Sequence, residues 1–138
     1  MTVTFTNIWW EKIIKIIRGF LDDEFKGVLP VYTGTKKPEG NQFIQIVPLG
    51  STLVRQDATM ETREYNLDVW FFFSAKNIKE DSIKQVTRLI SRIEALFHDN
   101  IVTTTYWDGS IDATEINVVE GGYEIKFSYS CKYAGNVG

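Results

Sequence analysis

The sequence contains one cysteine and one histidine among its 138 residues, and this scarcity excludes several kinds of chemistry. Cys131 has no partner for an intramolecular disulfide, and no Cys-x-x-Cys pair exists for zinc or redox chemistry. We therefore expect the chain to fold in a reducing compartment. The net charge of -3 argues against a dedicated nucleic-acid-binding protein, because such proteins are usually basic, although it leaves room for a local basic patch.

The sequence also lacks an apolar run long enough for a membrane-spanning helix or an unbroken signal-peptide core. Charges interrupt its most apolar stretch, at residues 8–17. The apolar residues there instead recur at helical spacing, namely Trp10, Ile13, Ile14, Ile17 and Leu21. This pattern predicts an amphipathic helix over residues 7–25, with Asn7 as its N-cap and with Gly27 and Pro30 ending it.

Hydrophobic residues make up 43% of the chain and aromatic residues 14%, which is enough for a core without a disulfide or a structural metal. The sequence shows no repeat, no low-complexity tract and no dividing linker. Residues 1–138 are therefore predicted to form a single domain, with only residues 134–138 loosely attached.

Strand-like patterns occupy the stretch between residues 28 and 74. A short strand is predicted at residues 28–32, and a second at residues 43–47, stopped by Pro48 and Gly50. The clearest alternation follows, with an apolar face made of Tyr65, Leu67, Val69, Phe71 and Phe73. The opposite face changes from polar to aromatic partway along.

A second amphipathic helix is predicted over residues 78–98, with Asn77 as its N-cap and Asn100 as its C-cap. Its apolar positions are Ile83, Val86, Ile90, Ile93 and Phe97. Glu80 precedes Lys84 by four residues, a spacing that favours a surface ion pair.

Two further strands, at residues 111–119 and 123–133, are joined through Gly121 and Gly122, which is typical of a tight hairpin. A turn is predicted before them at residues 107–109. The order α-β-β-β-α-β-β and the one-sided helices predict an α+β, two-layer sandwich. Both helices would pack on one face of a mainly antiparallel sheet.

No group of residues makes a convincing catalytic or metal site, so we expect neither an enzyme nor a cofactor. His98 lies in the last turn of the second helix, where a cation suits the helix dipole. Cys131 alternates with aromatic residues on an apolar face and is expected to be buried. Asp108 and Asp112 lack the ligand spacing of a calcium loop, and residues 34–37 lack the glycine spacing of a phosphate loop.

Two surface features are candidates for contact with a partner. Lys84, Arg88 and Arg92 form a basic stripe on the second helix, which is either a solvated face or a contact for an acidic partner subunit, with nucleic acid a distant third.

The second feature is the sheet face that the helices leave uncovered. It carries Trp70 and Phe72, together with either Ile44 and Ile46 or Phe43 and Val47. Such an apolar patch marks an interface, unless a loop or the N-terminal segment Val3–Phe5 folds over it.

The layout resembles that of the tail terminator, or tail-completion, proteins of tailed bacteriophages. The resemblance covers nearly the whole chain and rests on a pattern of elements. These are the leading helix at residues 8–25, the loop through Pro38, residues 43–48 (FIQIVP), residues 63–73 (REYNLDVWFFF), the helix at 83–97 and the end of the closing hairpin at 127–133 (FSYSCKY).

This resemblance implies a structural virion protein, synthesised and assembled in the host cytoplasm. It would form a homo-hexameric ring that caps the tail tube, ends tail elongation and docks with the neck or connector protein. In a contractile tail the ring would also contact the sheath protein. DNA would pass through the ring without sequence-specific binding.

The polar stretch at residues 50–62 resembles a long hairpin loop that projects toward the lumen or the tube. Its charged residues, with the one that follows it, are Arg55, Asp57, Glu61 and Arg63. If this placement is correct, replacing both arginines by glutamate abolishes capping.

Three alternatives stay open. A head-tail connector subunit of the same fold would differ only in the ring that it touches. A small enzyme would be revealed by activity screening. A membrane-surface module would use Trp9 and Trp10, which liposome flotation tests.

Overall fold

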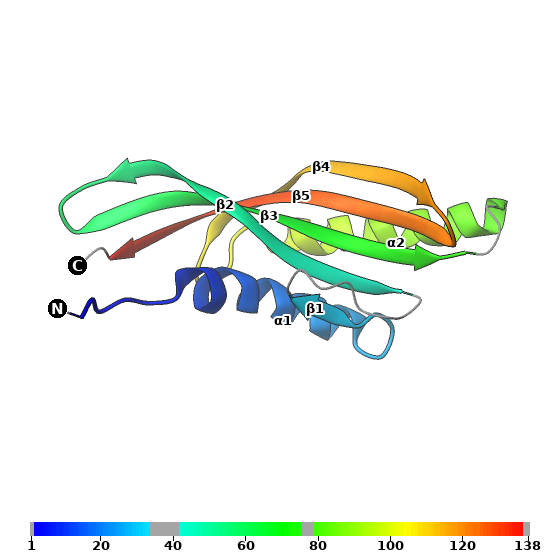
Figure 1. Ribbon diagram of the computed structural model, residues 1–138, viewed down its shortest axis with the longest axis horizontal. Helices are drawn as coiled ribbons and strands as arrows, with labels where there is room; N and C mark the ends of the chain where they lie inside the picture. The colour runs from blue at the N-terminus through cyan, green and yellow to red at the C-terminus, as the bar shows by residue number, and fades with distance from the viewer. Residues whose placement is uncertain (1, 34–41, 76–78, 137–138) are drawn as a thin grey trace.

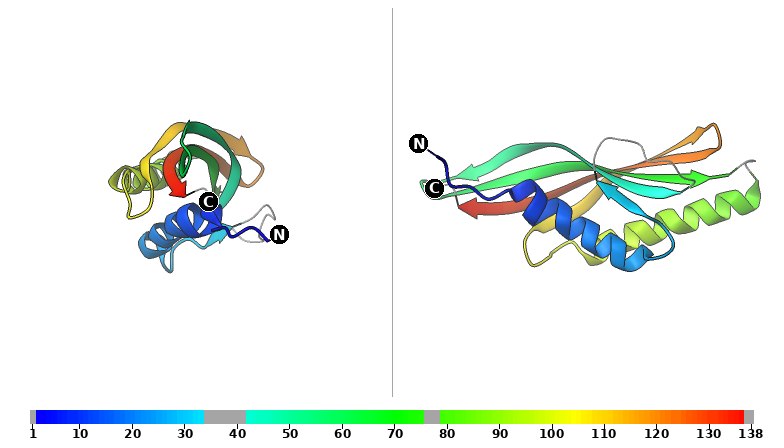
Figure 2. Two further views of the ribbon diagram at one scale, coloured as in Figure 1. Left: turned by 90° about the vertical axis from the view of Figure 1, so that its left-hand side faces the viewer. Right: turned by 60° about the horizontal axis from the view of Figure 1, so that its bottom comes forward.

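The computed structural model describes residues 2–33, 42–75 and 79–136. In this part of the chain one sheet carries the helices on a single face, as the end-on view in Figure 2 shows. The elements are η1 (Trp9–Ile14, a π-helical segment), α1 (Lys15–Phe25), β1 (Val31–Thr33), β2 (Phe43–Gln56), β3 (Met60–Ser74), α2 (Glu80–Asp99), β4 (Trp107–Val119) and β5 (Gly122–Asn136) (Figure 1). The predicted α+β sandwich and its element order are confirmed.

The sheet has five strands in the order β1-β2-β3-β5-β4. The short β1 is parallel to β2, and every other neighbouring pair is antiparallel. The apolar face of β3 and the matching face of β5 lie under the helices and form one buried cluster with them. The largest buried side chains of this core include Phe25, Phe71, Phe97, Phe127 and Tyr129.

The first helix begins as predicted, because the backbone N–H of Trp10 donates to Asn7 Oδ1 at 3.2 Å. Its first turns form the π-helical η1, in which the i→i+5 bonding widens the turn. This rotation brings Trp9, rather than the predicted Trp10, toward the sheet. Trp9 packs edge-on against Tyr65 with ring centroids 4.8 Å apart, whereas Trp10 is 36% exposed.

The second helix buries four of its five predicted apolar residues, namely Val86, Ile90, Ile93 and Phe97. Ile83 is 47% exposed, because the first turn of α2 lies at the end of the sheet (Figure 1). The predicted C-cap is confirmed, since Asn100 Nδ2 donates to the Leu96 carbonyl at 2.8 Å. The predicted N-cap, Asn77, lies outside the described residues.

Strands β2 to β5 are all longer than predicted. Pro48 and Gly50 do not stop β2, which continues to Gln56 through irregular register at Pro48/Gly50 and again at Leu53/Arg55. A proline is tolerated there because, within the described part of the chain, β1 pairs only with residues 44–46 and β2 is an edge strand beyond them. The expected loose tail is also wrong for residues 134–136, which pair with β3.

The predicted hairpin between β4 and β5 is confirmed. Gly121 and Gly122 have φ of 85° and 153°, and a Cβ on Gly122 would come within 1.9 Å of the Phe73 carbonyl oxygen. The predicted turn at residues 107–109 is wrong. These residues begin β4, and the turn signal corresponds to a break in register between Trp107 and Ser110, where Asp108 has φ of 53°.

Candidate interaction surfaces

The helix-free face of the sheet carries an aromatic patch, which consists of Tyr32, Phe43, Trp70 and Phe72. The register pairs Phe43 with Phe72, and the two rings stack at 5.2 Å with an interplanar angle of 15°. Tyr32, on β1, meets Phe43 edge-on at 6.1 Å. Tyr32, Phe43 and Phe72 thus form a cluster of rings in contact, contributed by three strands.

The register also decides between the two sets of β2 residues that the sequence left open. Residues paired across an antiparallel ladder share a face, so Phe43 and Val47 lie on the helix-free side, opposite Phe72 and Asp68. Ile44 and Ile46 face the core and are fully buried. The patch is not fully open, because Phe43 is only 2% exposed and Trp70 and Phe72 are each partly buried.

The helix-free face becomes polar from β3 toward β4. Lys126 Nζ lies 6.0 Å from the centroid of the Trp70 ring and 3.3 Å from a carboxylate oxygen of Glu115. Burial raises the pKa of the neighbouring Asp68. The aromatic patch is therefore bordered on one side by the ion pair of Lys126 and Glu115, with Asp68 beside it.

The tip of the β2–β3 hairpin, residues 52–64, extends beyond the helices as an arm, with residues 132–136 of β5 paired alongside it (Figure 1). The long loop expected within residues 50–62 is wrong, because the strands continue and only residues 57–59 turn between them. Asp57 closes this turn: its Oδ1 accepts the backbone N–H of Thr59 at 2.9 Å and that of Met60 at 2.8 Å. These bonds lower the pKa of Asp57.

The arm separates the two arginines that the sequence grouped together. Arg55 pairs with Thr62 on the helix-free face, and it makes no ion pair with any described residue. Arg63 pairs with Leu53 on the helix side, where its Nε donates to Glu61 Oε1. Arg55 is therefore available to a partner, whereas Arg63 and Glu61 neutralise each other.

The N-terminal segment does not fold over the aromatic patch, as one alternative proposed. It borders an open groove of about 470 Å³ on the helix side of the arm, with Tyr65 and Tyr133 as the opposite wall. Val3 and Phe5 remain 75% and 80% exposed.

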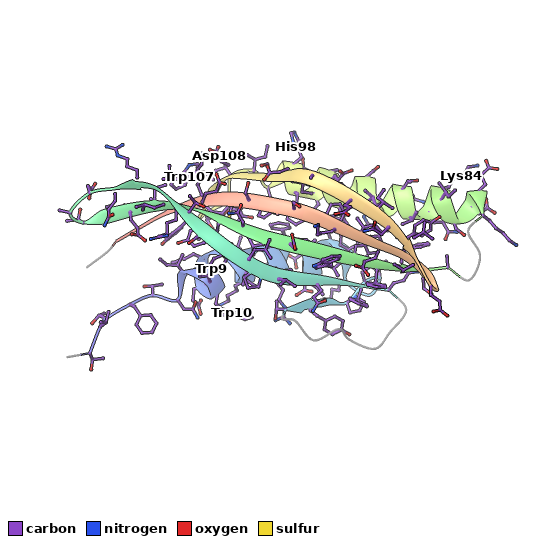
Figure 3. The ribbon with its side chains drawn as sticks, turned by 45° about the horizontal axis from the view of Figure 1, so that its top comes forward. Trp9, Trp10, Lys84, His98, Trp107 and Asp108 are labelled. Carbon is purple, nitrogen blue, oxygen red and sulfur yellow. The ribbon has the colours of Figure 1, made fainter. Side chains whose placement is uncertain are left out.

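The basic stripe on α2 is partly used within the subunit. Lys84 lies 3.5 Å from Glu80, which confirms the predicted surface pair, and Arg92 binds Glu24 of α1 at 2.8 Å. Arg88 is exposed and makes no ion pair within the described residues. Figure 3 shows Lys84 near one end of α2 and His98 near the other. Of the three basic residues, Arg88 alone is left for an acidic partner.

Three of the residues weighed for catalysis have contacts within the fold, namely Cys131, Asp108 and Asp112. Cys131 is buried as predicted, and this burial raises its pKa to about 12. Asp108 pairs with Lys132, while Asp112 accepts bonds from Ser110 and Ser130. No cluster of potential metal ligands occurs within the described ranges, and none of the helices described there is long and apolar enough to cross a membrane.

Sequence reasoning missed several residues of the helix-free face, namely Tyr32, Lys126 and Glu115. Tyr32 lies on a strand of three residues, too short for an alternation to show which side it faces. Lys126 and Glu115 could have been found, because the register of the closing hairpin follows from the di-glycine turn and places them opposite each other.

No protein-family model matches this chain, and no curated protein matches it.

Proposed function

We propose that this chain is a structural virion protein of a tailed bacteriophage, a subunit of a hexameric ring that caps the tail tube. The ring ends tail elongation and offers a docking surface to the neck protein, and to the sheath protein in a contractile tail. The proposal originates in the pattern of elements along the sequence, which the fold retains.

The arm is the observation that carries the proposal. A head-to-tail ring needs two unlike surfaces on each subunit, and a cap needs a third element that reaches the tube. The arm extends beyond the helices, and it carries the exposed apolar side chains Leu53, Val54 and Met60. The aromatic patch lies on the same sheet, on the face that no helix covers.

The deciding experiment is a capping assay. Tail-tube subunits of the same virus are polymerised with and without the protein, and tube lengths and tube ends are imaged by electron microscopy. Capping predicts shorter tubes with a ring at one end. Unchanged lengths and bare ends would contradict the proposal, and binding to isolated capsids without capping would instead support a head-tail connector subunit.

Charge reversal tests the role of the arm. Arg55→Glu should abolish capping, because it inverts an unpaired charge on the arm without breaking an ion pair within the described residues. Arg88→Glu is the matched control, since it reverses an unpaired arginine on α2. Loss of capping with Arg88→Glu alone would assign the tube contact to the helix instead of the arm. The double replacement of Arg55 and Arg63 by glutamate is harder to interpret, because it also removes the ion-pair partner of Glu61.

A further inference from the structure

The outer edge of β4 is unpaired in the part of the chain that the structure describes. β4 pairs only with β5 within the described residues, and its second half, residues 113–119, keeps regular register with β5. This half (ATEINVV) has no proline, glycine or lysine, the residues that commonly blunt an edge strand. At the opposite edge, β2 carries Pro48 and two breaks in register.

Exposed apolar side chains accompany this open edge. Ile116 and Val118 pair with Ile125 and Tyr123 on the helix side of the sheet, yet they remain 49% and 62% exposed. The helix α2 contacts β4 through a hydrogen bond in which Thr114 Oγ1 donates to Glu94 Oε2 at 2.8 Å. Because β4 and α2 run in opposite directions, the exposed Ile83 lies toward the same end of the molecule as Val118 (Figure 1).

The segment is complementary to itself. When two copies pair in antiparallel fashion about Ile116, Ile116 meets its own counterpart and Thr114 meets Val118 on the helix side. On the other side Glu115 meets Asn117, so no like charge lies directly opposite the single charge of the segment. A two-fold contact requires this kind of self-complementary patch.

We infer that two copies of the free protein pair through β4, antiparallel and centred on Ile116, to form one continuous ten-stranded sheet across a two-fold axis. A two-fold contact cannot generate a head-to-tail ring, so a capping ring would use other surfaces of the subunit. The inference therefore does not rest on the proposed function, and a capping assay does not test it.

Disulfide trapping tests the register directly. In the inferred pair the two Cα atoms at position 116 are about 4.5–5.5 Å apart, within the range that a disulfide spans. Ile116→Cys should therefore give a covalent dimer under mild oxidation. Val118→Cys is the control on the same edge, since its two copies would lie four residues apart along the strands, about 14 Å. Cys131 does not compete, because it is buried.

Light-scattering mass across a concentration series gives the second test. The wild type should approach twice 15.9 kDa, and Ile116→Lys should weaken the dimer at least tenfold by placing two ammonium groups against each other. Val28→Lys, at an exposed site in the segment between α1 and β1, should leave the dimer unchanged. Far-ultraviolet circular dichroism confirms that each variant is folded.

Three results would overturn the inference. These are a monomer at every concentration, a wild-type mass near six subunits without trapping at position 116, and trapping at position 118 equal to that at position 116.

Discussion

Arg92 of α2 holds the C-terminal end of α1 through Glu24. Its Nε donates to Glu24 Oε1 at 2.8 Å, and its second guanidinium nitrogen donates to the Glu24 carbonyl oxygen at 3.1 Å. The guanidinium also lies 4.8 Å from the centroid of the Phe25 ring. One side chain thus joins the two helices through residues that are 68 positions apart in the sequence.

Loss of this contact should lower the stability of the fold. We expect Arg92→Ala to reduce the free energy of unfolding by about 1 kcal/mol, a small value because both partners are partly exposed. Arg88→Ala is the matched control and should change it by less than about 0.5 kcal/mol. Urea unfolding followed by circular dichroism measures both, and equal effects would show that the link between the helices contributes nothing.

Two glycines should respond in opposite directions to alanine. Gly122→Ala should destabilise the protein by at least about 2 kcal/mol, because the new Cβ would meet the Phe73 carbonyl oxygen. Gly19→Ala should stabilise it by about 0.5–1 kcal/mol, since it lies within α1 and a Cβ there meets no atom within 4 Å. The midpoints of denaturant unfolding curves for the two variants and the wild type test both predictions. A tolerated alanine at position 122 would contradict the close approach of the hairpin turn to β3.

Stability should fall at alkaline pH. Burial raises the pKa of Cys131 from 9.0 to about 12, and it raises the pKa of Tyr106 and Tyr129 above 10.0. These groups release their protons more readily in the unfolded chain than in the folded one. Their contribution to stability is therefore complete below about pH 9 and is lost as the pH rises toward 12.

Unfolding free energies measured at about pH 8 and pH 10.5 test this dependence. Cys131→Ala should show a shallower decline than the wild type, whatever its absolute stability. An equal decline in both proteins would assign the effect to the tyrosines, and no decline in either would contradict burial as the cause.

The turn at the tip of the arm should depend on Asp57. Asp57→Ala removes the acceptor for the backbone N–H groups of Thr59 and Met60, so hydrogen exchange at these two amides should accelerate. Asp57→Asn keeps an acceptor and should have a smaller effect. Because the pKa of Asp57 is lowered in the fold, its contribution is present above pH 3.8 and is lost as the pH falls through the lower value of the folded protein. Exchange rates in the alanine variant equal to those of the wild type would contradict this role.

The helix and strand patterns determined most of the fold because they are local. Alternation placed Tyr65 and Phe71 of β3 on the buried face, and helical spacing identified Ile90 and Phe97 as core residues. Each of these predictions needs only the side-chain periods of a strand or a helix, which adjacent residues already display.

The candidate surfaces were only partly predictable. Trp70 and Phe72 were correctly placed away from the helices, because β3 has a clear period of two. The placement of Phe43 instead of Ile44 beside them was undecidable, since both faces of β2 are apolar there and only the register with β3 separates them.

The sequence by itself determined which residues form helices and strands and, for most of them, which side is apolar. The tertiary structure alone decided that β2 continues past Pro48, that Trp9 replaces Trp10 against the sheet, and that Arg92 binds α1. It also decided that β4 keeps an open edge among the residues that the structure describes. Each of these features depends on which segment, distant in the sequence, lies beside the residues concerned. Local periodicity carries no information about such contacts, because they arise only when the sheet and the helix layer assemble.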